Sequence, residues 1–207
     1  MCRKVGILGG SFDPIHKGHL HIAMAAKNEF SLDAVIFIPA GHSPNKDEHK
    51  MTPAEHRARM TELAILEYPD FYLSRMEIDS QETSYTYLTL GRLKEMHPDW
   101  ELYFIMGADS LDYFDKWYHP EIICEKAAVL VAVRDDLKQQ EICDKIAEIK
   151  ALFPARIYPL KVDGLSVSSS EIRKALKEGE AQALLPEAVT DYIIEHQLYQ
   201  TEGCRWN

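Results

Sequence analysis

Short apolar runs alternate with segments of helical periodicity from one end of the 207-residue chain to the other. The runs are rich in Val, Ile, Leu and Phe, and they have the length of buried strands. They cover residues 5–8, 34–39, 71–73, 102–106, 128–133 and 157–160. Strands that alternate with helices form a parallel sheet with helices on both faces. The sequence therefore predicts a doubly wound, Rossmann-like α/β fold.

The segments between the runs carry helix start signals. Thr52, Pro53 and Glu55 stand at the N-cap, N1 and N3 positions, which these residue types favour. The predicted helices cover residues 20–30, 52–66, 84–96, 142–152, 168–179 and 186–197, and another begins at 119–121. Polar and glycine-rich signals follow the predicted strands at Leu8, Pro39, Met106 and Val133. Ligands of doubly wound folds bind at the carboxyl ends of strands near a topological switch point, so a site is expected there.

Composition indicates one domain that spans residues 1–207, because 46% of the residues are hydrophobic and neither a repeat nor a low-complexity linker interrupts them. The net charge of −10 gives no basic footprint for a nucleic-acid polymer or an anionic membrane. The four cysteines are scattered, and no apolar run has the length of a signal segment or a membrane span. These features predict a cytoplasmic protein with reduced thiols.

The stretch from Val5 to Leu20 carries the clearest chemical signal. A buried strand is predicted to end in a tight turn at Gly9-Gly10, followed by a loop and a helix. The first N–H groups of a helix form a ready site for phosphate. His16 and His19 are three residues apart, so both imidazoles would lie on one face of that helix start. They could stabilise charge that develops on a phosphoryl group, and Gly18 would let a ligand approach the backbone.

Other interpretations of this stretch were weighed. The dinucleotide fingerprint G-x-G-x-x-G is absent, and no P-loop sequence occurs in the chain. A metal site made of Asp13, His16 and His19 lacks an obvious fourth ligand. A structural turn with two surface histidines is the simplest alternative. Phosphate binding is favoured, because the glycines, the position after a strand and the histidines all agree with it.

Two motifs carry a resemblance to a known family. The sequence GGSFDPIHKGH at residues 9–19 resembles the signature of adenylyl- and cytidylyltransferases, α/β enzymes that move a nucleotidyl group onto a phosphate. The sequence SSSEIR at residues 168–173 would by itself indicate an N-cap serine and an ordinary surface arginine. It also resembles the second signature of the same family, S-S-x-x-I-R, and could form a second phosphate cradle. The resemblance implies a nucleotidyltransferase fold.

Further segments narrow the resemblance to bacterial nicotinate mononucleotide adenylyltransferases, which make the dinucleotide in NAD synthesis. The GADS turn at 107–110 and Trp117 resemble the part that borders the pyridine nucleotide, where the Trp stacks on the ring. By itself, Trp117 would be a core or rim aromatic. Residues 84–86 resemble the SYT segment beside the nicotinate carboxylate, although they could simply cap a helix. Residues 56–60 and 186–199 are also similar.

The resemblance implies adenylyl transfer from ATP, with Mg²⁺, to nicotinate mononucleotide, giving deamido-NAD and pyrophosphate. His16 and His19 are the implied catalytic residues. The implied ATP-binding residues are Gly9, Gly10, Ser11, Phe12, His16, Gly18, His19, Gly107, Asp109, Ser168, Ser169, Ile172 and Arg173. The implied pyridine-nucleotide-binding residues are Lys46, Ser84, Tyr85, Thr86, Asp109, Trp117 and Arg134. No protein metal ligand is implied, and a homo-oligomer is compatible with the resemblance.

The chain departs from the family pattern at two positions. Asn45 replaces a histidine that could touch phosphate, and Leu88 stands where an acidic residue is common. Phosphopantetheine adenylyltransferases share the fold and the second motif, but they usually have Thr at the position of His16. A regulatory nucleotide-binding domain without turnover is the alternative from another class of protein. Release of pyrophosphate would separate an enzyme from such a domain.

Overall fold

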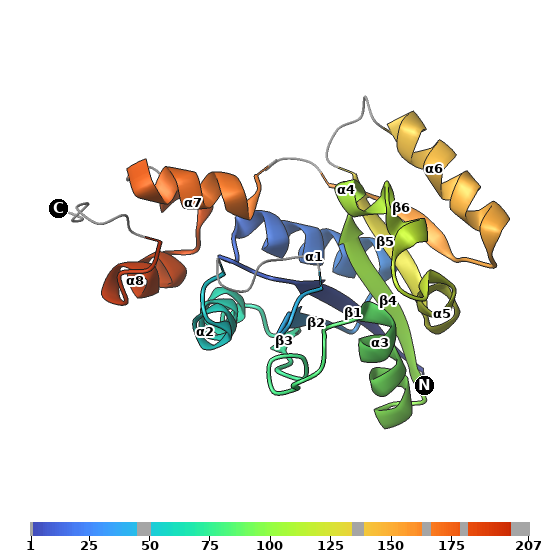
Figure 1. Cartoon of the computed structure of the whole chain (residues 1–207), viewed down its shortest axis with the longest axis horizontal. Helices are drawn as coiled ribbons and strands as arrows, with labels where there is room; N and C mark the ends of the chain where they lie inside the picture. The colour runs from blue at the N-terminus through green and yellow to red at the C-terminus, as the bar shows by residue number, and fades with distance from the viewer. Residues whose placement is uncertain (1, 45–50, 134–138, 163–166, 179–181, 200–207) are drawn as a thin grey trace.

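The computed structural model describes residues 2–44, 51–133, 139–162, 167–178 and 182–199, and these form a parallel sheet flanked by helices (Figure 1). The strands are β1 (Arg3–Gly10), β2 (Ala34–Pro39), β3 (Phe71–Leu73), β4 (Trp100–Gly107), β5 (Ala127–Val133) and β6 (Ile157–Lys161). Their order in the sheet is β3-β2-β1-β4-β5-β6, and every pairing is parallel. The predicted doubly wound α/β fold is therefore confirmed.

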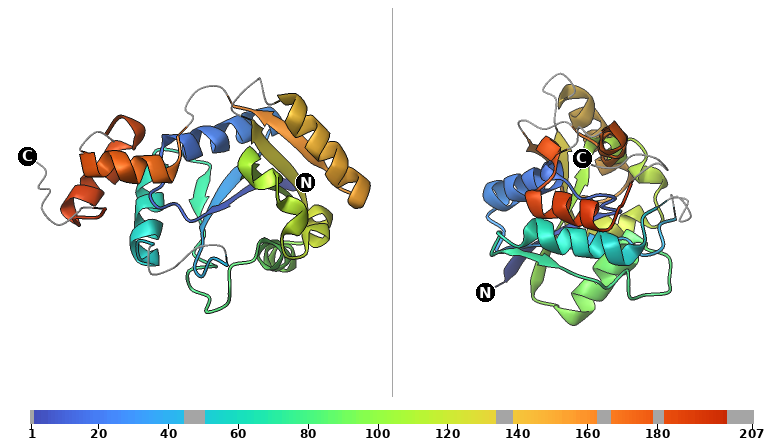
Figure 2. Two further views of the ribbon diagram at one scale, coloured as in Figure 1. Left: turned by 45° about the horizontal axis from the view of Figure 1, so that its top comes forward. Right: turned by 90° about the vertical axis from the view of Figure 1, so that its left-hand side faces the viewer.

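Helices cover both faces of the sheet. They are α1 (Lys17–Phe30), α2 (Ala54–Ile65), α3 (Thr86–Met96), α4 (Ala108–Leu111), α5 (Pro120–Lys126), α6 (Gln139–Leu152), α7 (Ser169–Glu178) and α8 (Glu187–Glu195). Short 3-10 turns lie at Phe114–Lys116 and Gln182–Leu184. One core cluster joins the sheet to α1, α2, α7 and α8, and a second joins it to α3, α4, α5 and α6. Figure 2 shows α8 beside α2, which it contacts.

Alternate residues of the longer strands supply the two core clusters. In β4, Phe104 packs into the cluster beneath α3 and α5, whereas Ile105 packs into the cluster beneath α1. This is the period of two that a strand imposes on its side chains. Every residue of β5 is buried, which explains why its sequence AAVLVAV is apolar throughout.

Two predicted boundaries are wrong. Gly9 and Gly10 do not form a tight turn, because they pair with Ile38 and Pro39 of β2 and continue the strand. The chain turns only in the following loop. Helix α2 begins at Ala54 with Pro53 at the N-cap position, so Thr52 is not the N-cap. Backbone groups of Thr52 are instead held by the side chains of Asp13 and Arg57.

The topological switch point lies between β1 and β4. The chain runs outward from β1 to β2 and β3 on one side, and it returns to β4, β5 and β6 on the other. The carboxyl ends of β1 and β4 meet there, with Leu8 beside Ile105. At Gly9 and at Gly107, an added Cβ would meet nothing within 4 Å. The sheet therefore leaves open space at the place where such folds bind their ligands.

The three cysteines that the structure describes carry free thiols, in line with the predicted reduced state. Cys2 and Cys143 are exposed, whereas burial raises the pKa of the Cys124 thiol to about 11. Cys204 lies outside the described residues. None of the helices described here is both long and apolar enough to cross a membrane.

Candidate active site

The loop between β1 and α1 is held by its aromatic side chain. Phe12 has a φ of 46°, a backbone conformation that is unusual for a bulky residue. Its ring is buried, and it meets the His19 ring edge-on at 5.1 Å between centroids and the Phe37 ring at 5.9 Å. Packing of the Phe12 ring thus stabilises the loop and supports one of the two candidate catalytic histidines.

His16 and His19 lie together at the start of α1, as predicted. Their ring centroids are 3.7 Å apart, and the rings are inclined by 33°. His16 is 1% exposed, whereas His19 is half-buried. The His16 backbone N–H donates to Nδ1 of His19 at 3.3 Å. A neutral His19 ring therefore carries its proton on Nε2, where it can donate a hydrogen bond.

Gly18 lies directly beside the His16 ring. A Cβ at this position would lie 2.9 Å from Nδ1 of His16 and 3.4 Å from a methyl carbon of Val167. Such a distance to the imidazole is shorter than real Cβ contacts allow. The glycine therefore makes room for the His16 ring, and its predicted contact with a ligand remains a prediction.

The second motif begins α7 and contacts the β1–α1 loop directly. Ser169 donates through its hydroxyl to the Pro14 carbonyl at 3.1 Å, and Arg173 Nη1 donates to the Asp13 carbonyl at 2.6 Å. These contacts join residues that are 155 and 160 positions apart in the chain. The structure thus brings the two signature motifs together, although nothing in either motif predicts their mutual contact.

In the second motif, two side chains cap the start of α7 and another packs into the core. Ser168 and Glu171 form a capping box, in which Glu171 Oε2 accepts from the Ser168 N–H at 2.7 Å and the Glu171 N–H donates to Ser168 Oγ at 3.2 Å. The Ile172 side chain is fully buried in the core. Any contact of Ile172 with ATP would therefore involve its backbone rather than its side chain.

Three of the residues predicted to contact the pyridine nucleotide, namely Ser84, Tyr85 and Thr86, lie at the start of α3. Ser84 accepts the Gly41 N–H at 3.1 Å, which ties this segment to the loop after β2. The Tyr85 ring stacks on Tyr118 at 4.9 Å between centroids, and Thr86 is the first residue of α3. The stack brings residues 84–86 close to the segment that contains Trp117.

Trp117 is partly buried against the second core cluster. Its ring centroid lies 5.4 Å from that of Phe114 and 6.1 Å from that of Phe104. The indole Nε1 is buried, and it has no hydrogen-bond partner among the described residues. Asp109 is exposed in the first turn of α4, directly after the open space at Gly107. Their predicted contacts with the mononucleotide remain predictions.

Three positions singled out in the sequence lie outside the described residues, namely Asn45, Lys46 and Arg134. The predicted contacts of Lys46 and Arg134 with the pyridine nucleotide therefore remain predictions. Leu88, where the family often has an acidic residue, is partly buried within the first turn of α3.

The carboxyl group of Glu77 contacts the first turns of α3. Glu77 Oε1 accepts the hydroxyl hydrogen of Thr89 at 2.6 Å. Burial raises the pKa of Glu77 above its ordinary value, although hydrogen bonds with Thr89 and Ser84 and the charge of Arg92 act in the opposite direction. This carboxyl is therefore easier to protonate than an exposed glutamate.

Arg57 is a structural residue of this site that the sequence did not reveal. Its side chain is 2% exposed, and it donates to the carbonyls of Ser11 at 2.7 Å, Ala40 at 2.8 Å and Thr52 at 2.9 Å. The guanidinium fork thus connects the β1–α1 loop to both ends of the β2–α2 connection, which lie around the candidate site. The periodicity of α2 could have signalled it, because residues 57, 60, 61 and 64 are all buried and share one face.

The described residues do not provide a metal centre. Within the part of the chain that the structure describes, no group of three or more His, Cys, Asp or Glu side chains is arranged to hold a metal ion. Asp13, which the metal hypothesis needed beside the histidines, is instead hydrogen-bonded to Tyr199 and to the Thr52 N–H.

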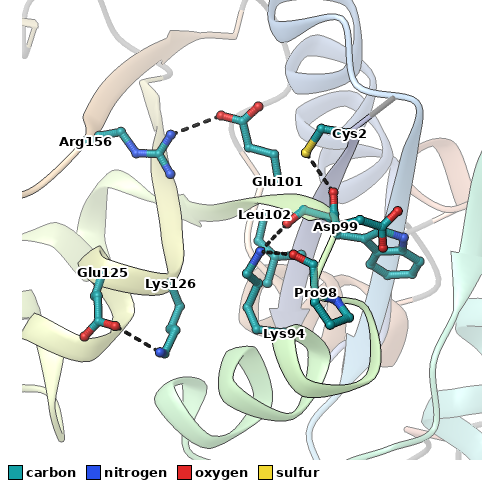
Figure 3. Close-up of a pocket in the computed structure, with 10 residues that line it drawn as sticks. Cys2, Lys94, Pro98, Asp99, Glu101, Leu102, Glu125, Lys126 and Arg156 are labelled. Atoms are coloured by element: carbon teal, nitrogen blue, oxygen red, sulfur yellow. Dashed lines mark hydrogen bonds and ion pairs between the residues drawn. The ribbon is translucent and has the colours of Figure 1, made fainter.

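A hollow of about 520 Å³ lies at the amino ends of the strands, near the beginning of β4 and away from the candidate site (Figure 3). Its basic side chains are engaged by nearby protein groups. Arg156 pairs with Glu101 at 3.0 Å, Lys126 pairs with Glu125 at 2.9 Å, and Lys94 Nζ donates to the carbonyls of Pro98 and Trp100. Acidic and basic groups are balanced there, so the hollow lacks the convergent positive charge that ATP requires.

Comparisons with known proteins agree with this geometry. Residues 7–175 match the family model described as cytidylyltransferase-like. The chain is 43% identical to a probable nicotinate-nucleotide adenylyltransferase of Lachnoclostridium phytofermentans, with 95% of this chain and 99% of the relative covered. It is 37% identical to the probable nicotinate-nucleotide adenylyltransferase of Thermoanaerobacter sp. (strain X514), with 96% and 95% covered.

A solved structure shows the same fold. The Plasmodium falciparum nicotinic acid mononucleotide adenylyltransferase complexed with NaAD matches with a TM-score of 0.78 and 26% sequence identity, and the match covers 95% of this chain and 97% of that chain. The family match and the identities over nearly the whole length leave one assignment. The chain belongs to the cytidylyltransferase-like family and, within it, to the nicotinate-nucleotide adenylyltransferases.

Proposed function

We propose that the protein transfers the adenylyl group of ATP to nicotinate mononucleotide, giving deamido-NAD (nicotinate adenine dinucleotide) and pyrophosphate. One observation carries the proposal, namely the direct contact between the two signature motifs. Ser169 and Arg173 of α7 bond to the loop that leads into His16 and His19. Two helix N-termini thus converge on one loop, an arrangement that suits a chain of phosphates. The names of the relatives support the same reaction.

The reaction needs no protein nucleophile. The phosphate of the mononucleotide attacks the α-phosphorus of ATP in line, and the bond to pyrophosphate breaks as the new P–O bond forms. Catalysis then depends on positioning and on stabilisation of charge. His16 and His19 would donate hydrogen bonds to the α-phosphate oxygens, supported by the positive end of the α1 dipole. Ser169 and Arg173 would hold the β- and γ-phosphates.

Magnesium would enter with ATP rather than reside in the protein. The described residues offer no cluster of three acidic or histidine ligands, and Mg²⁺ is commonly held by substrate phosphates and water. Bound there, the ion would neutralise charge on the leaving pyrophosphate. The protein's own contribution is the pair of helix starts and the side chains described above.

A panel of acceptors tests the proposal. The full chain is incubated with MgATP and nicotinate mononucleotide, phosphopantetheine or no acceptor, and pyrophosphate release is measured. We expect release with the mononucleotide alone, together with formation of the dinucleotide. Release with phosphopantetheine only would identify the related adenylyltransferase instead. Binding of ATP without any release would indicate a regulatory nucleotide-binding domain.

A further inference from the structure

We propose that Tyr199 is a positioning residue that keeps the Asp13 carboxylate from capturing Arg173, so that the guanidinium remains available to the phosphates of ATP. The inference rests on the proposed function, in which Arg173 binds those phosphates. Tyr199 lies 186 residues from Asp13 in the chain, yet its hydroxyl donates to Asp13 Oδ1 at 2.6 Å. The segment after α8 therefore reaches the loop that begins the active site.

The Asp13 carboxylate is held at both oxygens. Asp13 is 3% exposed, and a buried carboxylate is stable only with hydrogen-bond donors around it. Oδ1 accepts from Tyr199, and Oδ2 accepts from the Thr52 N–H at 3.4 Å. Arg173 Nη1 lies 4.0 Å from Oδ2, which is too far for a hydrogen bond. That nitrogen donates instead to the Asp13 backbone carbonyl at 2.6 Å.

In this geometry Arg173 bonds to a protein carbonyl, and its guanidinium can still bind a ligand. The backbone carbonyl orients the guanidinium at modest strength, because a neutral acceptor binds it less strongly than a carboxylate does. Without the Tyr199 hydroxyl, Oδ1 would lose the donor that the described residues give it, and the carboxylate would turn toward the nearby guanidinium. A close, buried Asp13–Arg173 pair would then compete with phosphate for the same donors.

The environment of Tyr199 suits it to donate permanently. Burial, followed by the charge of Asp13 and the hydrogen bond to it, raises the pKa of Tyr199 above its ordinary value. The hydroxyl therefore stays protonated at neutral pH. The Leu198 N–H donates to the Ile193 carbonyl at 3.0 Å, and Tyr199 has a φ of 63°, so the segment after α8 turns the Tyr199 side chain back toward the loop.

The experiment compares Tyr199→Phe with a matched variant, Tyr192→Phe. The Tyr192→Phe substitution also removes one hydroxyl group, which lies 2.9 Å from Nδ1 of His56. That contact joins α8 to α2 and does not involve Asp13 or Arg173. Calorimetric titrations use ATP, pyrophosphate and nicotinate mononucleotide with each full-length variant. We expect Tyr199→Phe to weaken ATP and pyrophosphate about tenfold, the scale of one hydrogen bond to a charged group, with mononucleotide affinity unchanged. Tyr192→Phe should change none of the three affinities.

A rescue variant distinguishes positioning from general damage to the fold. Asp13→Asn removes the charge that would capture Arg173, so the double variant Asp13→Asn/Tyr199→Phe should bind ATP more tightly than Tyr199→Phe. Arg173→Ala tests the underlying assignment, and it should weaken ATP and pyrophosphate more than the mononucleotide. If Arg173→Ala has no effect on ATP, the phosphate role proposed for Arg173 is wrong. If Arg173→Ala weakens ATP while Tyr199→Phe does not, or if the double variant is no better, the role of Tyr199 alone is overturned.

Discussion

At the scale of single residues, the proposed function assigns the chemistry to the two imidazoles at the start of α1. Either His16→Ala or His19→Ala should lower kcat by about a hundredfold or more, because each removes a preorganised donor to the transition state. His16 is 1% exposed, so its loss should also lower Tm, whereas His19→Ala should change Tm less. Steady-state kinetics and thermal unfolding measure the two effects.

An exposed histidine of the same helix provides the control. His21 lies on α1 but is exposed, so His21→Ala should retain the wild-type kcat. Near-wild-type kcat values for both His16→Ala and His19→Ala would remove the catalytic assignment.

Glu77 gives a prediction about pH. Burial raises its pKa above the unfolded value, so the folded state favours the protonated carboxyl. Its contribution to stability is therefore fully present below the unfolded pKa and is lost as pH rises through the folded pKa. Glu77→Gln, which stays neutral and retains an acceptor for Thr89, should raise Tm at neutral pH and change it little at about pH 4.

Calorimetric scans at the two pH values test this prediction. Glu82→Gln is the matched control, because Glu82 is exposed and paired with Arg92 on the surface, where such pairs contribute little. A lower Tm for Glu77→Gln than for wild type at neutral pH would show that the ionised carboxylate stabilises the fold.

At the scale of elements, some glycines avoid a steric clash within the fold, and others border open space at a strand end. A Cβ at Gly41 would lie 2.1 Å from the Glu77 carbonyl oxygen, so Gly41→Ala should lower the free energy of unfolding by roughly 1–3 kcal/mol, the range for overpacking. A Cβ at Gly9 would meet nothing within 4 Å. Gly9→Ala should therefore retain Tm but weaken ATP binding.

Thermal unfolding and ATP titration of both variants separate the two purposes. Loss of stability in Gly9→Ala, or wild-type ATP affinity in a stable Gly9→Ala protein, would show that the space above β1 is not reserved for the nucleotide.

Local patterns predicted the elements better than their boundaries. The apolar run of β5 and the helical stripe of α2 are properties of neighbouring residues, so the sequence reveals them directly. The end of β1 is not, because Gly9 and Gly10 remain extended only through pairing with β2, almost thirty residues later. Propensity favoured a turn at these glycines, and the tertiary pairing overrode it.

The same reasoning explains which features of the site could be predicted from the sequence. His16 and His19 needed only a strand, a loop and a helix in succession, so their proximity was predictable. The partners of Arg57 were not, because its three carbonyl acceptors lie in two different loops, although the periodicity of α2 places the residue on the buried face. The contact of Tyr199 with Asp13 likewise forms only when the segment after α8 returns to the β1–α1 loop.

At the scale of the whole molecule, the sheet order determines where substrates meet. The switch point between β1 and β4 places the two signature motifs and the α3 start around the carboxyl ends of the strands. The N–H groups of Ser84, Tyr85 and Leu88 donate within the protein, so the positive end of the α3 dipole is what favours a carboxylate on the pyridine ring over a neutral amide. Choice of acceptor is therefore the property that depends on the assembled site as a whole.

Steady-state kinetics with nicotinate and nicotinamide mononucleotides tests this account most directly. The two compounds differ only in a carboxylate against an amide, and sites built around such a group can discriminate by factors of roughly ten thousand. We predict a kcat/KM preference for the acid on that scale. Trp117→Ala should raise KM for both compounds and retain the preference, because ring stacking does not distinguish them. Comparable kcat/KM values for acid and amide in the wild-type protein would contradict the assignment of nicotinate mononucleotide as the acceptor.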